Sequence, residues 1–338
     1  MHTIKHVFEK IIDIETLRNA SRFACRTRKD KNEVEEFLEN KENNLLRLRQ
    51  SLIDGTYRSS RYKMFTIHEK GKERRIADLP LYPDRILHWA ICLACESETN
   101  KKLIDQTYAS VPGRGYHDAV KKVYRYIRSD DKIRYVLVFD IRKFFQSIST
   151  DILKRRLSKT YRDERFLQLM FQLIDEYPES GIPIGNRYSP MLANLYLSKM
   201  DHALKEKYHV HYYVRFMDDC CILGYSKEWL HKILGIIKEQ LHDIGLELKT
   251  NCQIFPLDSR GVHFLGYDIY SDHIRLRKET KKRMIDGLRD IRERQNDGDA
   301  LTEHDKGVIA SYNGVLMNCN GRRLYKKYIQ PLLDQNLI

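Results

Sequence analysis

The sequence has no long apolar run, although hydrophobic residues make up 42% of its 338 positions. A membrane-spanning helix needs roughly 18 or more consecutive apolar residues, so we expect no membrane span. The first residues, MHTIKHVFEKIIDIE, include acidic side chains and lack the sustained apolar core of a signal peptide. Internal repeats and low-complexity linkers are also missing. We therefore expect a folded protein in the cytoplasm.

Cysteines are few, and their number, seven, is odd. Cys220 and Cys221 are adjacent, which does not suit a disulfide framework. Cys92 and Cys95 have the spacing of zinc ligands but lie in an apolar helical run, RILHWAICLACE. Because no second cysteine or histidine pair follows at ligand spacing, we expect buried thiols and not a structural zinc site.

Acidic residues are in the minority, with 47 Asp and Glu against 60 Lys and Arg and a net charge of +13. The isoelectric point near 9.2 suggests a polyanionic partner, although a soluble protein with a basic surface has the same balance. The length favours two or three packed units.

Hydrophobic periodicity and turn residues predict an α+β chain. Helices are expected at 31–54, 84–97, 116–129, 150–158, 162–176, 189–206 and 226–244, followed by a helical region at 278–338. Strands are expected at 62–68, 72–78, 133–141, 210–217, 220–224, 246–249, 252–256 and 262–270, with a turn at Lys70-Gly71 between the first two. The central order of strand, helices, hairpin, helix and strand suits a split βαβ sheet.

Two aspartates, Asp218 and Asp219, stand between apolar runs in YYVRFMDDCCILGY. Aspartate is common in hairpin turns, but the apolar and aromatic flanks argue against a simple exposed turn. Asp140 ends another apolar strand, RYVLVFD, where it could also cap a helix. Three carboxylates in one sheet would repel one another unless a cation neutralised them. Because Mg²⁺ prefers carboxylate oxygens and shares its shell with phosphates, the pattern predicts a two-metal site for phosphoryl transfer.

Seven motifs, in order, resemble those of reverse transcriptases. The catalytic motifs are FDIRKFFQSI (139–148) and FMDD (216–219), and the loop and helix around template and nucleotide are GIPIGNRYSPMLANLYL (181–197). LELKT (246–250) and HFLGY (263–267) resemble the next palm motif and the primer grip. GKERRIADLPLYPDRILHWAI and SVPGRGYHDAV resemble fingers motifs of bacterial enzymes related to group II introns and retroelements.

The resemblance implies a right-hand polymerase fold and an RNA-directed DNA polymerase, a nucleotidyltransferase. Its parts would be an N-terminal helical extension at 1–55, fingers at 56–132, a palm on a split βαβ sheet at 133–272 with 150–188 partly fingers, and a small helical thumb at 273–338. Template RNA, cDNA and dNTPs would be its partners. By resemblance, Asp140 and Asp218 bridge two Mg²⁺ ions, for which Mn²⁺ can substitute. Asp219 supports this site, and the carbonyl of Ile141 faces the second ion.

The resemblance also implies a nucleotide site. Phe145, five residues after Asp140, matches the aromatic steric gate that leaves no room for a 2′-hydroxyl, although it could be an ordinary core residue. Cations at the hairpin tip would hold the triphosphate, although a solvated charge run has the same composition. The lysine of LELKT would protonate the pyrophosphate, although it could equally be a generic surface lysine. Besides Ile141 and Phe145, the implied nucleotide-binding residues are Lys72, Arg74, Arg75, Ile184, Gly185 and Lys249.

Nucleic acid contacts follow from the same motifs. They are expected in the Gly-rich turn, the loop before the long helix, the primer grip and the basic start of the thumb. The thumb cations should contact the backbone without reading bases. The implied residues are Arg114, Asn186, Ser189, Phe264, Leu265, Gly266, Arg277, Lys281 and Lys282.

Ile184 stands where most reverse transcriptases carry Gln. This resembles the enzymes of diversity-generating retroelements, which are bacterial or phage-encoded and copy a template RNA with errors at adenines. That family also implies a basic, helical, oligomeric accessory variability protein as partner. Ser189-Pro190 has the general reverse transcriptase form, so a retron-type or other stand-alone bacterial enzyme stays the alternative. A defence-associated enzyme is less favoured, as is a binding module without chemistry, because all three aspartates are present.

Overall fold

The computed structural model describes residues 3–28, 31–69 and 72–334. They form two compact units, each assembled from separate stretches of the chain. One unit contains Met1–Asp105, Ile141–Lys207 and Ile237–Glu247, and the other contains Gln106–Asp140, Tyr208–Ile236 and Leu248–Ile338. These two units do not coincide with the expected fingers, palm and thumb. The boundaries of those three parts stay a prediction.

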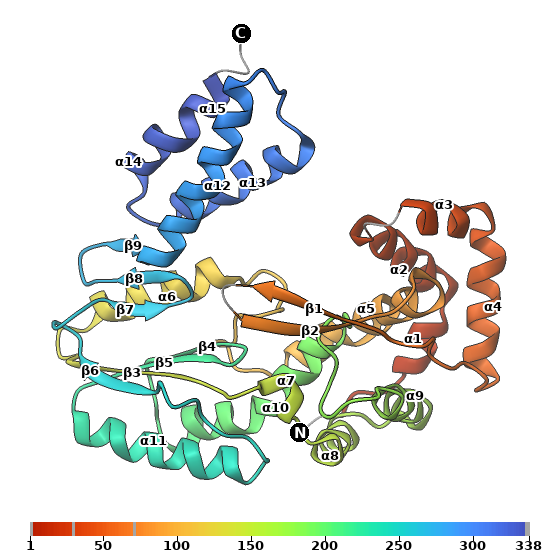
Figure 1. Ribbon diagram of the computed structural model, residues 1–338. Helices are drawn as coiled ribbons and strands as arrows, with labels where there is room; N and C mark the ends of the chain where they lie inside the picture. The colour runs from red at the N-terminus through yellow and green to blue at the C-terminus, as the bar shows by residue number, and fades with distance from the viewer. Residues whose placement is uncertain (1–2, 29–30, 70–71, 335–338) are drawn as a thin grey trace. The chain divides into compact units, whose positions relative to one another are not determined.

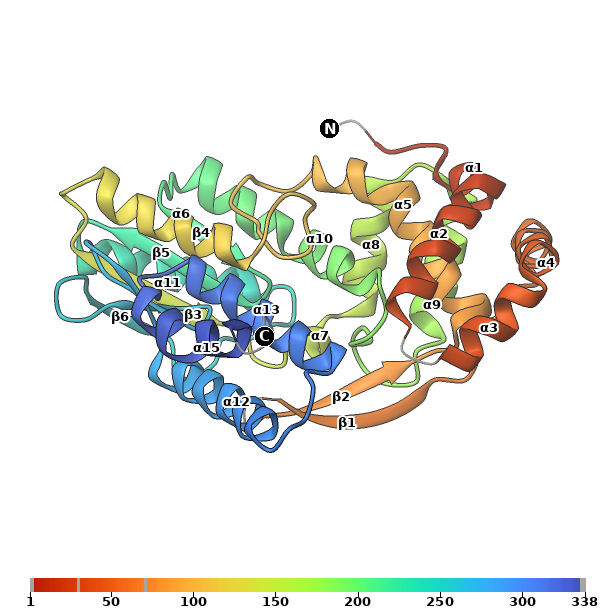
Figure 2. The ribbon, with the colours of Figure 1, turned by 90° about the horizontal axis from the view of Figure 1, so that it is seen from above.

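The first unit is mainly helical. Its helices are α1 (Val7–Ile12), α2 (Ile14–Thr27), α3 (Lys31–Glu39), α4 (Lys41–Ile53), η1 (Leu81–Arg85), α5 (Ile86–Asn100), α7 (Phe144–Ser147), α8 (Thr150–Thr160), α9 (Glu164–Asp175), α10 (Ser189–His202) and η2 (Ala203–Lys207). Figure 2 shows α5 beside α1 and α2. Because α5 is apolar on nearly every side, most of it is buried. Cys92 and Cys95 lie in this interior, as predicted, and burial raises the pKa of the Cys92 thiol to about 12.

Two local predictions in this unit meet different outcomes. The single helix expected at 31–54 is wrong: α3 and α4 are separate, because Asn40 adopts a non-helical conformation between them (φ −123°, ψ 29°). The predicted hairpin is present as β1 (Lys63–Glu69) paired with β2 (Lys72–Asp78). Its turn at Lys70-Gly71 lies outside the described residues.

The second unit is built on an antiparallel sheet in the order β4-β5-β3-β6. Its strands are β4 (Tyr213–Phe216), β5 (Asp219–Gly224), β3 (Tyr135–Asp140) and β6 (Gln253–Pro256). Figure 1 shows α6 (Tyr116–Ser129) on one face of the sheet and the start of α11 (Lys227–His242) on the other. Because both faces are covered, β3 is an apolar run, and Val136 and Leu137 are fully buried.

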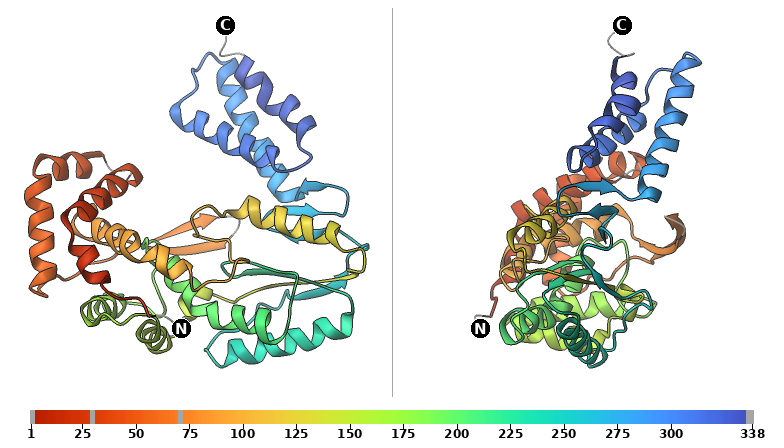
Figure 3. Two further views of the ribbon diagram at one scale, coloured as in Figure 1. Left: turned by 180° about the vertical axis from the view of Figure 1, so that it is seen from behind. Right: turned by 90° about the vertical axis from the view of Figure 1, so that its left-hand side faces the viewer.

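The C-terminal part of this unit joins a small sheet to a helical bundle. The sheet contains β7 (Val262–Phe264), β8 (Tyr267–Ile269) and β9 (Ile274–Leu276). Figure 3 shows α12 (Lys278–Asn296), α13 (Glu303–Met317), α14 (Arg322–Leu324), η3 (Tyr325–Ile329) and α15 (Gln330–Asp334) packed together. None of the described helices combines the length and the hydropathy that crossing a membrane requires.

Two strand predictions in the C-terminal third of the chain are wrong. The strand expected at 262–270 is a hairpin, because Leu265 (φ 48°) and Gly266 (φ 83°) form a two-residue turn. Positive φ at both central positions gives a turn whose twist matches that of the flanking strands. Residues 246–249 do not form a strand either; Leu248 alone among them is in a β-bridge.

Candidate active site

The register of the sheet brings two of the predicted aspartates together. Asp140, the last residue of β3, is the direct partner of Asp219, the first residue of β5. Residues directly opposite on antiparallel strands have Cβ atoms roughly 4.5–5.5 Å apart, and like charges there are destabilising. Asp218 lies next to this pair in the turn between β4 and β5. All three aspartates therefore meet at one end of the sheet, within the second unit.

The turn that carries Asp218 has an unusual backbone. Met217 and Asp218 are the two residues that join β4 to β5, and Met217 has a φ of 54°. Hairpin turns usually place glycine or asparagine where φ is positive. A residue held in this region stores strain of roughly 1–3 kcal/mol, which persists where surrounding contacts over-determine it.

Burial and repulsion act on the carboxylates. Burial, followed by the charges of Asp219 and Asp140, raises the pKa of Asp218 to about 7. Oδ2 of Asp140 accepts a hydrogen bond from the ammonium of Lys249, whereas its buried Oδ1 has no hydrogen-bond partner. The Lys249 amide also donates to the Asp140 carbonyl at 2.8 Å. The structure thus brings the predicted Lys249 to the aspartates.

This donor set fits a divalent ion that substrate helps to hold. Among the described residues, no three histidine, cysteine, aspartate or glutamate side chains converge closely enough to hold a metal by themselves. Mg²⁺, however, is usually held by one or two carboxylates together with water and substrate phosphates. The unpartnered Oδ1 of Asp140 and the raised pKa of the buried Asp218 fit a site that a further cation, besides the Lys249 ammonium, would stabilise. Asp140 and Asp218 would hold the ions, and Asp219 would support the site.

We expect the metal-free protein to lose stability as pH rises from about 4 to about 7. The pKa of Asp218 is raised from 3.8 to about 7 in the folded state, so folding favours the protonated carboxyl. This contribution is fully present below the unfolded pKa and is lost as pH rises through the folded value. Denaturation in EDTA at several pH values would measure it.

The Asp218→Asn variant is the control, because it should lack this part of the pH dependence. Adding Mg²⁺ should stabilise the parent protein more at pH 8 than at pH 5.5, where protons compete for the carboxylates. An identical pH dependence in parent and variant would contradict the assignment to Asp218.

The segment containing Phe145 is fixed to the loop before α10 within the first unit. The Ile182 amide donates to the Phe145 carbonyl at 2.9 Å. Gly181 has a φ of 80°, and a Cβ atom there would lie 2.1 Å from the same carbonyl, so only glycine fits. The ring of Phe145 is half-buried and meets Phe144 edge-on, with centroids 5.6 Å apart. Ile141, also in this unit, is fully buried.

The same loop is attached to the β1–β2 hairpin. The Ala77 amide of β2 donates to the Ile184 carbonyl at 2.9 Å, and a Cβ atom on Gly185 would lie 2.3 Å from the Ala77 carbonyl. Arg75 pairs with Glu179 at 2.7 Å. Glu179 is not among the site residues predicted from the sequence. Its only signal there is an acidic side chain close to the loop GIPIG. Arg74 is exposed, and the Lys72 side chain is not among those described.

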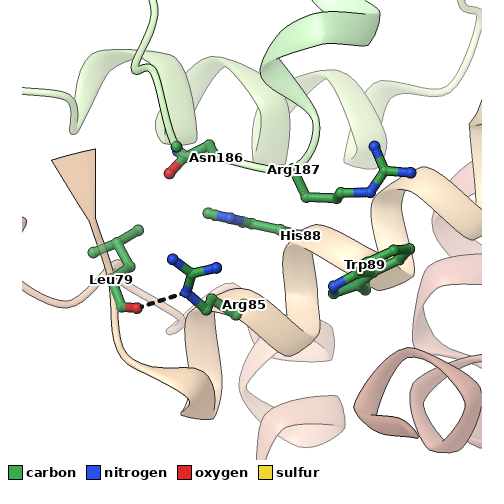
Figure 4. Close-up of a pocket in the computed structure, with 7 residues that line it drawn as sticks. Leu79, Arg85, His88, Trp89, Asn186 and Arg187 are labelled. Carbon is green, nitrogen blue, oxygen red and sulfur yellow. Dashed lines mark hydrogen bonds between the residues drawn. The ribbon is translucent and has the colours of Figure 1, made fainter. Parts of the chain in front are cut away.

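Two predicted nucleic acid contacts lie inside the first unit. Asn186 is 4% exposed, and its amide donates to the hydroxyls of Tyr62 at 2.9 Å and Tyr188 at 3.1 Å. Ser189 is also buried. Figure 4 shows Asn186 in the lining of a small pocket with Arg85 and His88. The Asn186 side chain therefore supports the loop from within, and both side chains are buried within the unit.

The other predicted nucleic acid contacts divide between surface and core. Phe264 is buried in the core of the second unit, whereas Leu265 and Gly266 form the half-buried turn of the β7–β8 hairpin. The Arg277 amide donates to the Gly266 carbonyl at 3.0 Å. Arg114 is partly buried, and its side chain donates to the Thr107 carbonyl at 3.2 Å. Two of the predicted contact residues are exposed on the surface of α12: Lys281 and Lys282.

A sequence profile decides the family. The profile described as reverse transcriptase (RNA-dependent DNA polymerase) matches residues 67–269, more than half of the chain and all three aspartates. The chain belongs to the reverse transcriptase family. Members of this family generally use divalent metal ions, in agreement with the carboxylate cluster.

Curated relatives place this reverse transcriptase near two kinds of bacterial enzyme. It is 26% identical to the group II intron-encoded protein LtrA of Lactococcus lactis over 170 residues, which are 47% of this chain and 28% of LtrA. It is 25% identical to the retron Ec73 reverse transcriptase of Escherichia coli over 174 residues, which are 47% of this chain and 55% of the relative. The match thus spans between about a quarter and about half of these relatives.

A solved structure confirms the fold. Telomerase from Candida tropicalis, in complex with a fragment of telomeric RNA, superimposes with a TM-score of 0.50 at 13% identity. The superposition covers 69% of this chain and 48% of the telomerase chain. The predicted α+β right-hand polymerase fold is therefore confirmed.

Proposed function

We propose that this reverse transcriptase copies template RNA into cDNA from dNTPs by two-metal phosphoryl transfer, with Mg²⁺ as the ions. The carboxylate cluster at the end of the sheet carries the proposal. Bound ions would activate the primer hydroxyl and stabilise the departing pyrophosphate. Asp140 and Asp218 would hold them, and Asp219 would support the site.

Cations already present in the chain would assist the reaction. The Lys249 ammonium lies at Asp140, from where it would give a proton to the pyrophosphate oxygen. Arg74 and Arg75 are exposed on β2, where they would hold the triphosphate. Arg75 would exchange its carboxylate partner, Glu179, for a phosphate oxygen. Lys281 and Lys282 would bind the nucleic acid backbone without reading its sequence.

Primer extension on an RNA template in the presence of Mg²⁺ tests this function. We expect labelled cDNA that depends on the template, on dNTPs and on Asp218. A binding module without chemistry would retain RNA in a filter or mobility assay but make no product. That outcome would overturn the polymerase proposal.

We further propose that the enzyme belongs to a bacterial or phage-encoded diversity-generating retroelement and makes adenine-directed errors. Ile184 supports this proposal, because an isoleucine side chain cannot make the hydrogen bonds that Gln offers around nucleotide and template. Its carbonyl is fixed to β2 and its side chain is partly exposed, so the side chain is the part that would meet a nucleotide. A basic, helical, oligomeric accessory protein would then be a partner. Pro190 and the similarity to a retron enzyme favour the alternative, a retron-type or other stand-alone reverse transcriptase.

Replacing Ile184 by glutamine should lower the rate of misincorporation opposite template adenines to roughly a tenth of the parent rate. The restored amide would hydrogen-bond where isoleucine cannot, so incorrect pairs would be held less well than correct ones. Sequencing of cDNA made by Ile184→Gln and by the parent on the same template would measure the change.

The control for this comparison is Ile182→Val, a substitution of a buried residue in the same loop. It should alter stability slightly and leave the error spectrum unchanged. Equal error rates in Ile184→Gln and the parent would contradict the role of Ile184. Errors spread evenly over all four template bases in the parent would count against the retroelement assignment.

A further inference from the structure

A buried arginine lies beside the turn formed by Met217 and Asp218, called the catalytic turn below. The mechanism proposed above gives this arginine no role. Arg215 of β4 is 0% exposed and is the largest fully buried side chain among the described residues. Burial of a charged group is costly unless it is paired and hydrogen-bonded. The two residues before it in the strand, Tyr213 and Val214, are also buried, so this whole part of β4 lies in the interior of the unit.

The contacts of Arg215 lead to the turn. One terminal nitrogen, Nη1, donates to the Met217 carbonyl at 3.2 Å. The other, Nη2, donates to the Thr107 hydroxyl at 3.4 Å. That carbonyl belongs to the peptide unit that leads directly into Asp218. The guanidinium therefore holds the turn at the residue whose φ is positive.

The anchor on the other side is itself fixed. Thr107 is fully buried and forms a parallel β-bridge with Arg215. On either side of this bridge, the Arg215 amide donates to the Gln106 carbonyl and the Tyr108 amide donates to the Arg215 carbonyl, each at 3.0 Å. The Thr107 carbonyl also accepts from the Arg114 side chain at 3.2 Å. Contacts thus connect the Gly-rich turn, through Thr107 and Arg215, to the catalytic turn.

We propose that Arg215 is a positioning residue for the polymerase reaction: it fixes the Met217 carbonyl, and thereby the place of Asp218 relative to Asp140, with Thr107 as its anchor. The proposal rests on the proposed function of the aspartates. A displacement of about 1 Å at a reacting group can lower a rate by about a hundredfold, so a looser turn should slow the chemical step.

The Arg215→Met variant separates this role from a purely structural one. Methionine places an unbranched apolar side chain in the buried position without a charge, so we expect the variant to fold, with lower stability because the Met217 carbonyl loses its donor. We expect its kcat for primer extension to fall by about 10- to 100-fold, because the turn is no longer fixed. The KM for dNTP should stay within about twofold, because no triphosphate contact is removed.

A titration with Mn²⁺ alone, followed by electron paramagnetic resonance, gives a readout that does not need activity. Removing a positive charge near the carboxylates would by itself tighten cation binding. Loss of positioning would weaken it, and we expect a several-fold weaker affinity. The sign of the change therefore distinguishes the two effects. Tighter Mn²⁺ binding by Arg215→Met would overturn the positioning role.

Two further variants keep the test decisive. Thr107→Val removes the anchoring hydroxyl and keeps the shape, so it should lower kcat and Mn²⁺ affinity in the same direction but less. Val214→Ala, in the same strand, should lower the melting temperature and leave kcat per folded molecule unchanged. The proposal fails if Arg215→Met loses activity only in proportion to stability, as Val214→Ala does. It also fails if Thr107→Val has the same kcat and the same Mn²⁺ affinity as the parent. If Arg215→Met does not fold, the result for Thr107→Val alone tests the proposal.

The two proposals can fail separately. A parent protein that makes no template-dependent DNA overturns the polymerase function. Arg215 is then judged by the Mn²⁺ titration alone, since metal binding at the aspartates requires no catalysis. An active parent whose kcat and Mn²⁺ affinity do not respond to either variant overturns the positioning role alone.

Discussion

Asp218→Asn is expected to abolish template-dependent DNA synthesis, with a fall in kcat of about a thousandfold or more. In the proposed function this carboxylate holds a metal ion, so its loss would remove several kcal/mol of transition-state stabilisation. Asparagine keeps the size of the side chain but lacks the charge that holds a divalent ion. The same change removes a carboxylate whose charge is disfavoured by burial and by the neighbouring aspartates, the two causes that raise the pKa of Asp218 to about 7. The variant should therefore be at least as stable as the parent at pH 8 in EDTA.

Single-turnover extension of a primer on an RNA template with Mg²⁺ would measure the loss, and thermal unfolding would measure the stability. Asp258→Asn is a matched control, because Asp258 is an exposed aspartate of the same unit. It should leave both quantities unchanged. A loss of activity that accompanies a fall in melting temperature would point to a folding defect, and normal activity in Asp218→Asn would exclude a catalytic role.

The combination of lower activity and equal or greater stability is the informative result. Most substitutions of partly buried residues reduce stability, because they remove favourable contacts. A catalytic cluster is an exception, since like charges are held together for function at the expense of folding. Asp140 is a different case, because its carboxylate also accepts a hydrogen bond from the Lys249 ammonium, a favourable contact that its substitution would remove.

The aspartate cluster could be predicted from the sequence because its geometry follows from local rules. Two apolar strands joined by a short turn predict a hairpin. Asp140 lies at the end of a strand buried on both faces, so it had to pair with a neighbour in the sheet. The pairing with Asp219 follows from the antiparallel register. The motif around Lys249 indicated chemistry, but its contact with Asp140 depends on the chain folding back beyond α11.

Other features depend on tertiary contacts that no local pattern records. The loop motif implies a nucleic acid contact for Asn186, but its amide donates to two tyrosine hydroxyls in the interior. Leu265 has a positive φ that leucine rarely adopts, so the sequence pattern predicts one strand where the structure has a hairpin. Arg215 did leave a signal, a charged residue in the apolar stretch YYVRFM, but its partner Thr107 is distant in sequence. Hydrophobic periodicity predicts helices and strands, but it does not predict which distant residues form buried hydrogen bonds with one another.

Phe145→Val should convert the enzyme to one that accepts ribonucleotides, with discrimination between dGTP and GTP falling by about 10- to 100-fold. The resemblance to reverse transcriptases implies that this aromatic ring occupies the space that a 2′-hydroxyl would need. The backbone under this ring is fixed, since the Phe145 carbonyl accepts from the Ile182 amide and Gly181 packs against it. Valine would therefore leave space that the surrounding chain cannot readily fill.

The ratio of kcat/KM for dGTP and GTP on one RNA template measures this effect, and the gain should appear in the GTP value. Phe144→Val is the control: Phe144 is 3% exposed and its ring meets that of Phe145 edge-on, so its loss should lower stability with little change in sugar selection. If Phe145→Val and Phe144→Val destabilise the protein alike and leave the ratio unchanged, Phe145 is an ordinary core residue. A selective gain with GTP would instead show that this half-buried ring faces the sugar of the incoming nucleotide.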